Sequence, residues 1–131
     1  MDREPQQHTL ARRRILILDE QASIAQLLAK MLQEFGCNVL GPASRVPEAL
    51  ALLAEHSVDA AIIDVKIKGK PSYALAKELN RRGIPWAFVS GNNTDEYVTR
   101  FPGVPVITKP YSSEHISHVL RDLLGLDARG G

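Results

Sequence analysis

The sequence predicts an α/β protein built on one open, doubly wound parallel sheet. Five strand-like apolar runs alternate with helix-like segments along the chain, and strands joined by helical crossovers pair in parallel. The runs are apolar throughout rather than alternating in polarity, which is typical of strands covered by helices on both faces. Ligands of such sheets bind beyond the carboxyl ends of the strands. We therefore expect any functional site at that edge.

The five strands are predicted from their apolar content and from the residues that bound them. Each is a short run that stops at glycine, proline or a polar side chain. The third is rich in alanine and isoleucine, and the second is short because Gly41-Pro42 closes it. In chain order, the predicted strands are residues 14–18, 38–40, 59–64, 86–89 and 104–108.

The helices are predicted from apolar residues at helical spacing and from signals at their ends. The first has apolar side chains at i, i+3, i+4, i+7, i+8 and i+11 from Ile24, and Gly36 follows as a cap. Pro47 fits the first turn of the second helix, and Ser72 is expected to cap the third. The cationic segment 65–71 is predicted to be a loop. The predicted helices are residues 24–35, 46–56 and 73–82, a short helix that Thr94 caps and that holds Tyr97, Val98 and Phe101, and residues 113–124.

Length and composition limit the classes of function. A chain of 131 residues is one domain by size. The net charge is +1 and no apolar stretch approaches about 20 residues, so neither nucleic-acid binding nor membrane insertion is expected. Cys37 is the sole cysteine and no signal-peptide core is present, which favours the cytoplasm. We expect a domain at residues 12–124 between flexible tails at 1–11 and 125–131.

Chemically useful side chains stand at the ends of the predicted strands. The first strand runs into Asp19 and Glu20, the third ends at Asp64, the fourth runs into Ser90, and the fifth runs into Lys109. Parallel strands bring these ends to one edge of the sheet. Three acids, a hydroxyl and a lysine at one edge are suited to holding a divalent cation and a phosphoryl group.

Together these segments resemble the receiver domain of bacterial two-component response regulators. The matching pieces are ILILDE at 15–20, DAAIID at 59–64, FVSG at 88–91 and ITKPY at 107–111. Each piece is short, but the four occur in the family's order and each lies at a strand end. The resemblance covers about residues 13–124. It implies a flavodoxin-like (βα)5 fold with strand order 2-1-3-4-5.

The resemblance also implies a role for each position. Asp64 would be the phosphoacceptor, Ser90 would hydrogen-bond the phosphoryl group, and Lys109 would pair with it. A cis peptide bond is implied between Lys109 and Pro110. The implied ligands of Mg²⁺ are Asp19, Glu20, Asp64 and the backbone carbonyl of Lys66.

The function that follows is that of a stand-alone response regulator rather than a turnover enzyme. It would receive phosphate from a sensor histidine kinase or a phosphotransfer protein and then signal by contact with a downstream protein. Self-association as a homodimer is a further form of output that the resemblance suggests.

Several positions depart from the family's pattern and keep other interpretations open. Glu20 stands where Asp is usual, Lys66 and Lys68 crowd the loop after Asp64, and Val106 replaces the usual switch aromatic. A phosphorylation-independent interaction module with a drifted metal site is therefore a second interpretation. A small-molecule binder of flavodoxin type is a third, although this sequence lacks phosphate-cradling glycines.

Overall fold

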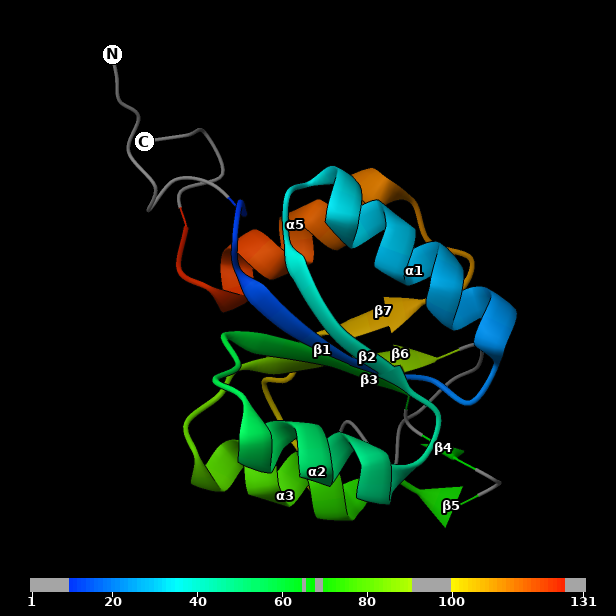
Figure 1. Cartoon of the computed structure of the whole chain (residues 1–131), viewed down its shortest axis with the longest axis vertical. Coiled ribbons are helices and arrows are strands. Elements are labelled where there is room, and N and C mark those ends of the chain that lie inside the picture. Colours follow the sequence, from blue (N-terminus) through cyan, green and yellow to red (C-terminus); the bar gives the residue numbers. More distant parts are fainter. Residues whose placement is uncertain (1–9, 65, 68–69, 91–99, 127–131) are drawn as a thin grey trace.

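The sheet has the strand order that the resemblance implies. The computed structural model of the chain describes residues 10–64, 66–67, 70–90 and 100–126, with the backbone alone at 66–67 and 70–71. Its five parallel strands lie in the order β2-β1-β3-β6-β7, which is 2-1-3-4-5 among the strands of this sheet (Figure 1). They are β1 (Arg14–Leu18), β2 (Asn38–Ala43), β3 (Ala60–Asp64), β6 (Trp86–Ser90) and β7 (Val106–Thr108).

Helices cover both faces of the sheet, as predicted for a doubly wound fold. Figure 1 shows α1 and α5 on one face and α2 and α3 on the other. None of the helices in the described part of the chain is long and apolar enough to cross a membrane. The described helices are α1 (Ala22–Glu34), α2 (Val46–Glu55), α3 (Tyr73–Arg81) and α5 (Ser113–Leu123).

Two apolar layers hold the helices to the sheet. Successive side chains of a strand point to opposite faces. Ile15 and Ile17 of β1 accordingly pack with α1 and α5, whereas Leu16 and Leu18 pack with α2 and α3. All four are at most 1% exposed. The continuous apolar runs of the sequence therefore supply both layers at once, which explains why they lack alternation.

Core packing reaches at least two residues beyond both predicted domain limits. Leu10, which we assigned to the tail at 1–11, is 3% exposed and packs in the layer of α1 and α5. Leu126 packs against the same layer, and its amide donates to the carbonyl of Arg121 over 2.8 Å. The assignment of Leu10 and Leu126 to tails was wrong because each is an apolar residue with a place in the core. The rest of both predicted tails lies outside the described residues.

The second strand is longer than predicted because its closing dipeptide takes part in it. Gly41-Pro42 is a cis peptide, and β2 continues past it to Ala43 with an irregular register against β1. Gly41 has φ +95°, and a Cβ there would lie 2.5 Å from the amide nitrogen of Ala43. Glycine is therefore required at this position. The extended β2 bears on the predicted site, because the carbonyl of Ala43 at its end accepts a hydrogen bond from the amide of Asp19 over 3.0 Å.

The predicted loop at 65–71 contains a second, two-stranded sheet. β4 (Lys66–Ile67) pairs antiparallel with β5 (Lys70–Pro71) directly after the phosphoacceptor candidate. The loop prediction was therefore wrong at these residues, since lysine and proline gave no strand signal. The predicted helix at Thr94, Tyr97 and Val98 lies outside the described residues.

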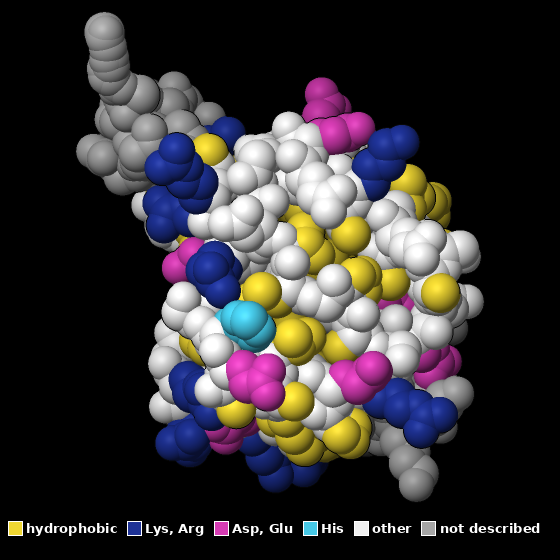
Figure 2. Space-filling model, in the orientation of Figure 1, with side chains coloured by type: hydrophobic (Ala, Val, Ile, Leu, Met, Phe, Trp, Pro, Cys, Tyr) yellow, Lys and Arg dark blue, Asp and Glu magenta, His cyan; other side chains and the backbone are white. Residues whose placement is uncertain are grey.

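The edge strand β2 lies at the surface between two helices. Figure 2 shows hydrophobic side chains reaching the surface between α1 and α2, where Figure 1 places β2. Val39 and Leu40 of this strand are partly buried, each against a different core layer. Among the described residues, the large apolar side chain that is strongly exposed is that of Leu27 in α1, which is 50% exposed.

Candidate functional site

Four of the predicted site residues meet at the carboxyl edge of the sheet. Asp19 follows β1, Asp64 ends β3, Ser90 ends β6 and Lys109 follows β7. These four strands are adjacent in the sheet. The register brings their ends level, because Leu18 pairs with Ile63, Asp64 with Val89 and Ser90 with Thr108. The convergence expected from sequence is therefore present in the fold.

The Lys109 ammonium lies between the two central carboxylates. Its Nζ is 3.7 Å from Oδ2 of Asp19 and 3.7 Å from Oδ2 of Asp64. The side chain of Asp19 is 3% exposed and that of Asp64 is 13% exposed. Two charges about 4 Å apart interact by about 4 kcal/mol at an effective dielectric of 20. One ammonium shared by two largely buried carboxylates thus offsets a repulsion that burial would otherwise strengthen.

Asp19 is held by the backbone on both sides of it. Its amide donates to the Ala43 carbonyl, and its Oδ1 accepts from the Gln21 amide over 2.9 Å. The second bond is an Asx-turn, the local pattern that short acidic side chains make with the amide two residues on. The side chain of Gln21 returns to the site, where its Oε1 lies 3.5 Å from Lys109 Nζ. A cavity of about 110 Å³, lined in part by Ala22 and Ser44, borders Asp19.

Ser90 and Lys109 are linked through the backbone. Ser90 is 3% exposed, and its carbonyl accepts from the Lys109 amide over 2.8 Å. The peptide bond between Lys109 and Pro110 is cis, as the resemblance implies. The hydrogen bond between the Lys109 amide and the Ser90 carbonyl holds the end of β6, which carries the serine, beside Lys109. Among the described residues, the ends of four adjacent strands therefore bring together the buried Asp19, the largely buried Asp64, the buried Ser90 and the ammonium of Lys109.

Comparison with known proteins agrees with this geometry. A family model described as the response regulator receiver domain matches residues 15–121. The chain belongs to this family. Receiver domains are signalling modules and generally not turnover enzymes, and they generally bind Mg²⁺ at the phosphorylation site.

Individual relatives of this receiver cover it to different extents. The transcriptional regulatory protein PdtaR of Mycobacterium tuberculosis is 31% identical over 104 residues, which are 76% of this chain and 51% of PdtaR. The chain spans about half the length of the curated relatives it matches. The BeF3-activated conformation of SdrG from Pseudomonas melonis Fr1 is 32% identical, with a TM-score of 0.75 over 87% of this chain and 98% of that chain. SdrG from Sphingomonas melonis Fr1 has a TM-score of 0.77 and the same identity, over 86% and 97%.

The predicted metal ligands of this receiver are not all gathered at one point. Asp19 and Asp64 share the lysine, whereas Glu20 has an exposed side chain. No group of three or more histidine, cysteine, aspartate or glutamate residues in the described ranges is placed to hold a metal. Lys66, whose carbonyl was the fourth implied ligand, begins β4 two residues after Asp64. The assignments of Glu20 and Lys66 stay predictions.

Two residues, Ser72 and Tyr111, have contacts near the site that were not predicted from the sequence. Ser72 was predicted as a helix cap, but its hydroxyl donates to the Asp64 carbonyl over 2.6 Å and makes no capping bond. Tyr111 belongs to the matching segment 107–111, and no link to the acidic residues of the site was predicted for it. Burial, with the nearby negative charges of Asp19 and Asp64, raises the pKa of Tyr111 to about 12. Its hydroxyl is buried and has no hydrogen-bond partner among the described residues.

Val106 lies in an aromatic environment although it is not aromatic itself. It pairs with Phe88 in the sheet and packs in the layer of α2 and α3. The ring of Phe101 packs in the same layer, 5.9 Å from Phe88 and 5.3 Å from Trp86 between centroids. Val106, at the position of the family's usual switch aromatic, is thus a partly buried aliphatic side chain packed against an apolar cluster.

Proposed function

We propose that this receiver accepts a phosphoryl group on Asp64 from a histidine kinase or a phosphotransfer protein. The observation that carries the proposal is the placement of Lys109 Nζ at 3.7 Å from both Asp64 and Asp19. An ammonium in that position can pair with an anion attached to Asp64. In such a transfer the attacking atom is a carboxylate oxygen of Asp64.

The step is a transfer from phosphohistidine to carboxylate. One oxygen of Asp64 forms a bond to phosphorus while the bond from phosphorus to the imidazole nitrogen breaks, which leaves an acyl phosphate and a free histidine. The charge of the transition state is spread over the three equatorial oxygens, so catalysis consists of positioning and charge neutralisation. Lys109 supplies positive charge, and the Ser90 hydroxyl is assigned as a hydrogen-bond donor to a phosphoryl oxygen.

The donor set at this edge fits Mg²⁺. Magnesium prefers oxygen ligands and is commonly held by one or two carboxylates together with phosphate oxygens. The carboxylates of Asp19 and Asp64, which share one ammonium, supply that number. Glu20 and the Lys66 carbonyl complete the proposed ligand set. When bound, Mg²⁺ would neutralise negative charge on the phosphoryl oxygens.

Output by contact with a partner protein is the second part of the proposal. The match to SdrG, whose structure was determined in a BeF3-activated conformation, supports a receiver surface that responds to an acyl-phosphate mimic. The downstream partner, or a second copy of the chain as a homodimer, would bind such a surface. A cytoplasmic location remains a prediction based on Cys37 as the sole cysteine.

The test is incubation with acetyl phosphate and Mg²⁺ followed by intact-protein mass measurement. We expect the mass to increase by one phosphoryl group in the natural protein and not in Asp64→Asn. Beryllofluoride should shift amide resonances around Asp64 and Ser90 in the natural protein only. A chain that gains no adduct and does not respond to beryllofluoride would be the phosphorylation-independent interaction module, which the exposed Glu20 and the aliphatic Val106 favour.

A further inference from the structure

Ser72 makes a buried contact with the main chain of the phosphoacceptor candidate. Its side chain is fully buried, at 0% exposure, and its Oγ donates to the Asp64 carbonyl over 2.6 Å. The two residues are eight positions apart. A hydroxyl donor enclosed in this way is rarely left without a partner, because desolvating it unpaired is costly.

The backbone of Ser72 explains why its hydroxyl is directed to Asp64 rather than to the helix. A capping residue usually has extended backbone angles, which aim its side chain at the amides of the first turn. Ser72 directly precedes α3 but has φ −92° and ψ 40°, and it makes no capping hydrogen bond. Its hydroxyl therefore acts on the end of β3 and not on the helix that follows it.

The hydrogen bond from Ser72 to the Asp64 carbonyl joins the two ends of the segment 64–72, which contains Lys66, whose carbonyl is a proposed metal ligand. β4 and β5 lie between Asp64 and Ser72 in the sequence and pair with each other. Anchoring the Asp64 carbonyl fixes the orientation of the peptide that follows Asp64, and with it the direction in which the Asp64 side chain leaves the backbone. That side chain must face Lys109, whose Nζ is 3.7 Å from its Oδ2.

We propose that Ser72 is a positioning residue for Asp64, which holds the acceptor carboxylate toward Lys109 and holds the strand that begins at Lys66 beside it. The inference rests on the proposed phosphorylation of Asp64. Removing the hydroxyl leaves the carbonyl without this donor, so the carboxylate samples more orientations. The consequence is slower phosphorylation of a protein that is still folded.

The experiment compares Ser72→Ala with a control variant on the same helix. Asn80→Ala removes a side-chain hydrogen bond of α3, the 2.9 Å bond between Trp86 Nε1 and Asn80 Oδ1, at the opposite end of the helix from Ser72. Rates of acyl-phosphate formation from acetyl phosphate are measured by intact mass under conditions where thermal melts show both variants folded. We expect Ser72→Ala to phosphorylate about fivefold more slowly, in keeping with the loss of one hydrogen bond, and Asn80→Ala to match the natural protein.

A conservative variant separates positioning from general stability. Ser72→Thr keeps the hydroxyl and adds a methyl group at a fully buried site, which lowers the melting temperature through overpacking. We expect its phosphorylation rate to exceed that of Ser72→Ala despite the lower melting temperature. The Mg²⁺ concentration for half-saturation, followed by amide resonances of unphosphorylated protein, should rise in Ser72→Ala and not in Asn80→Ala.

The outcomes distinguish this inference from the function on which it rests. If the natural protein gains no phosphoryl group, the proposed function fails and the role of Ser72 in it fails too. If the natural protein is phosphorylated but Ser72→Ala reacts as fast as Asn80→Ala and binds Mg²⁺ equally well, only the positioning role is overturned. Rates that follow melting temperature across all three variants would likewise reduce Ser72 to a structural residue.

Discussion

Lys109 Nζ lies 3.7 Å from Oδ2 of Asp64 and equally far from Oδ2 of Asp19. One ammonium thus lies within ion-pair distance of both carboxylates. A divalent ion placed between these carboxylates would compete with the ammonium for the same oxygens. The Lys109 ammonium is therefore expected to compete with the proposed Mg²⁺ for the oxygens of Asp19 and Asp64.

Replacing Lys109 by methionine is expected to raise the affinity for Mg²⁺ about tenfold, because the competing positive charge is removed from two largely buried carboxylates. The same change should slow phosphorylation, since the ammonium no longer pairs with the phosphoryl group. Calorimetric titration of the unphosphorylated protein with Mg²⁺ measures the first effect. Lys77→Met is the control, because it removes the same charge from an exposed position on α3. Equal Mg²⁺ affinity in the two variants would contradict the competition.

The fold and the convergence of the site were predictable from sequence because both depend on the order of strands and their end residues. A parallel sheet places every strand's carboxyl end at one edge. Asp19, Asp64, Ser90 and Lys109 therefore had to meet there once the strands were recognised. The C-terminal cap at Gly36 was predictable for a similar reason, since a positive φ, here +90°, selects glycine locally.

What could not be predicted depends on contacts between residues far apart in sequence. Ser72 has the residue type and the position of a helix cap, and only the return of the chain to Asp64 gives its hydroxyl another acceptor. Leu10 follows a polar segment in the sequence and was assigned to the tail, whereas in the fold it is buried in the core layer of α1 and α5. Gln21 could have been suspected from its position two residues after Asp19, where an Asx-turn places an amide.

Alkaline pH should reveal the link between Tyr111 and the acidic pair. Burial and the charges of Asp19 and Asp64 raise the pKa of Tyr111 from 10 to about 12. The folded state therefore binds this phenolic proton more tightly than the unfolded state. The stability that follows is fully present below pH 10 and is lost as the pH rises from 10 toward 12.

The measurement is tyrosinate absorbance against pH, together with urea unfolding at several alkaline pH values. Tyr111→Phe should lose the late-titrating tyrosine and flatten the fall in stability between pH 10 and 12. Asp64→Asn should move that titration to lower pH, because one of the two charges that disfavour the phenolate is gone. A late-titrating tyrosine that persists in Tyr111→Phe would assign the shift to another residue.

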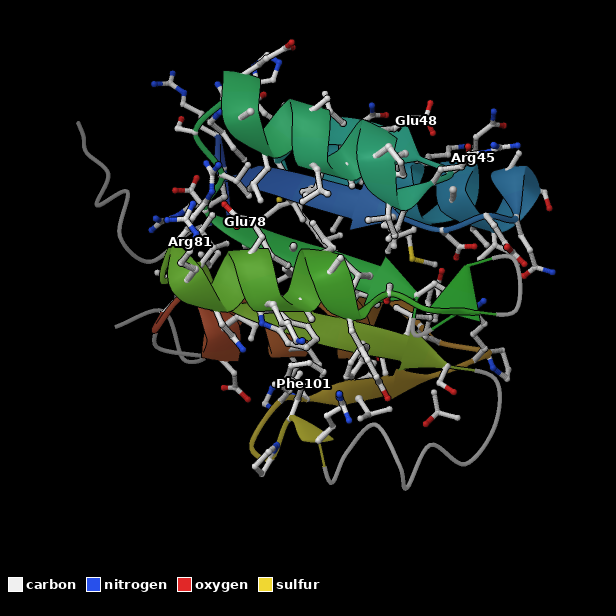
Figure 3. The ribbon with its side chains drawn as sticks, turned by 90° about the horizontal axis from the view of Figure 1, so that it is seen from below. Arg45, Glu48, Glu78, Arg81 and Phe101 are labelled. Carbon is white, nitrogen blue, oxygen red and sulfur yellow. The ribbon has the colours of Figure 1, made fainter. Side chains whose placement is uncertain are left out.

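The aromatic cluster of the layer of α2 and α3 should contribute substantially to stability. Phe101, labelled in Figure 3, makes edge contacts with Tyr73, Trp86 and Phe88 at centroid distances of 5.6, 5.3 and 5.9 Å. We expect Phe101→Ala to lower the free energy of unfolding by about 3 kcal/mol through lost burial and lost ring contacts. Phe35→Ala is the control, because Phe35 is also partly buried but packs in the other layer. Equal losses in the two variants would show that ring contacts add nothing to burial.

Two neighbouring arginines at the C-terminal end of α3, Arg81 in its last turn and Arg82 just after it, should differ in their importance for stability although both pair with Glu78. Figure 3 shows Glu78 and Arg81 together on the helix, and the Arg81 side chain is 69% exposed. Arg82 is 35% exposed, donates through Nε to Glu78 over 2.6 Å, and reaches α2 through Nη1 to the Leu53 carbonyl over 3.0 Å. That carbonyl belongs to the last turn of α2, where helix carbonyls lack partners within the helix.

Arg82→Ala is therefore expected to lower the free energy of unfolding by about 1 kcal/mol, because it removes a hydrogen bond from a charged donor that links two helices. Arg81→Ala should leave the urea midpoint nearly unchanged, since exposed ion pairs contribute little. Raising the salt concentration should weaken the pairs with Glu78 in the natural protein while the contact with the Leu53 carbonyl persists. If Arg81→Ala destabilised the protein as much as Arg82→Ala, the ion pair and not the bridge to α2 would account for the effect.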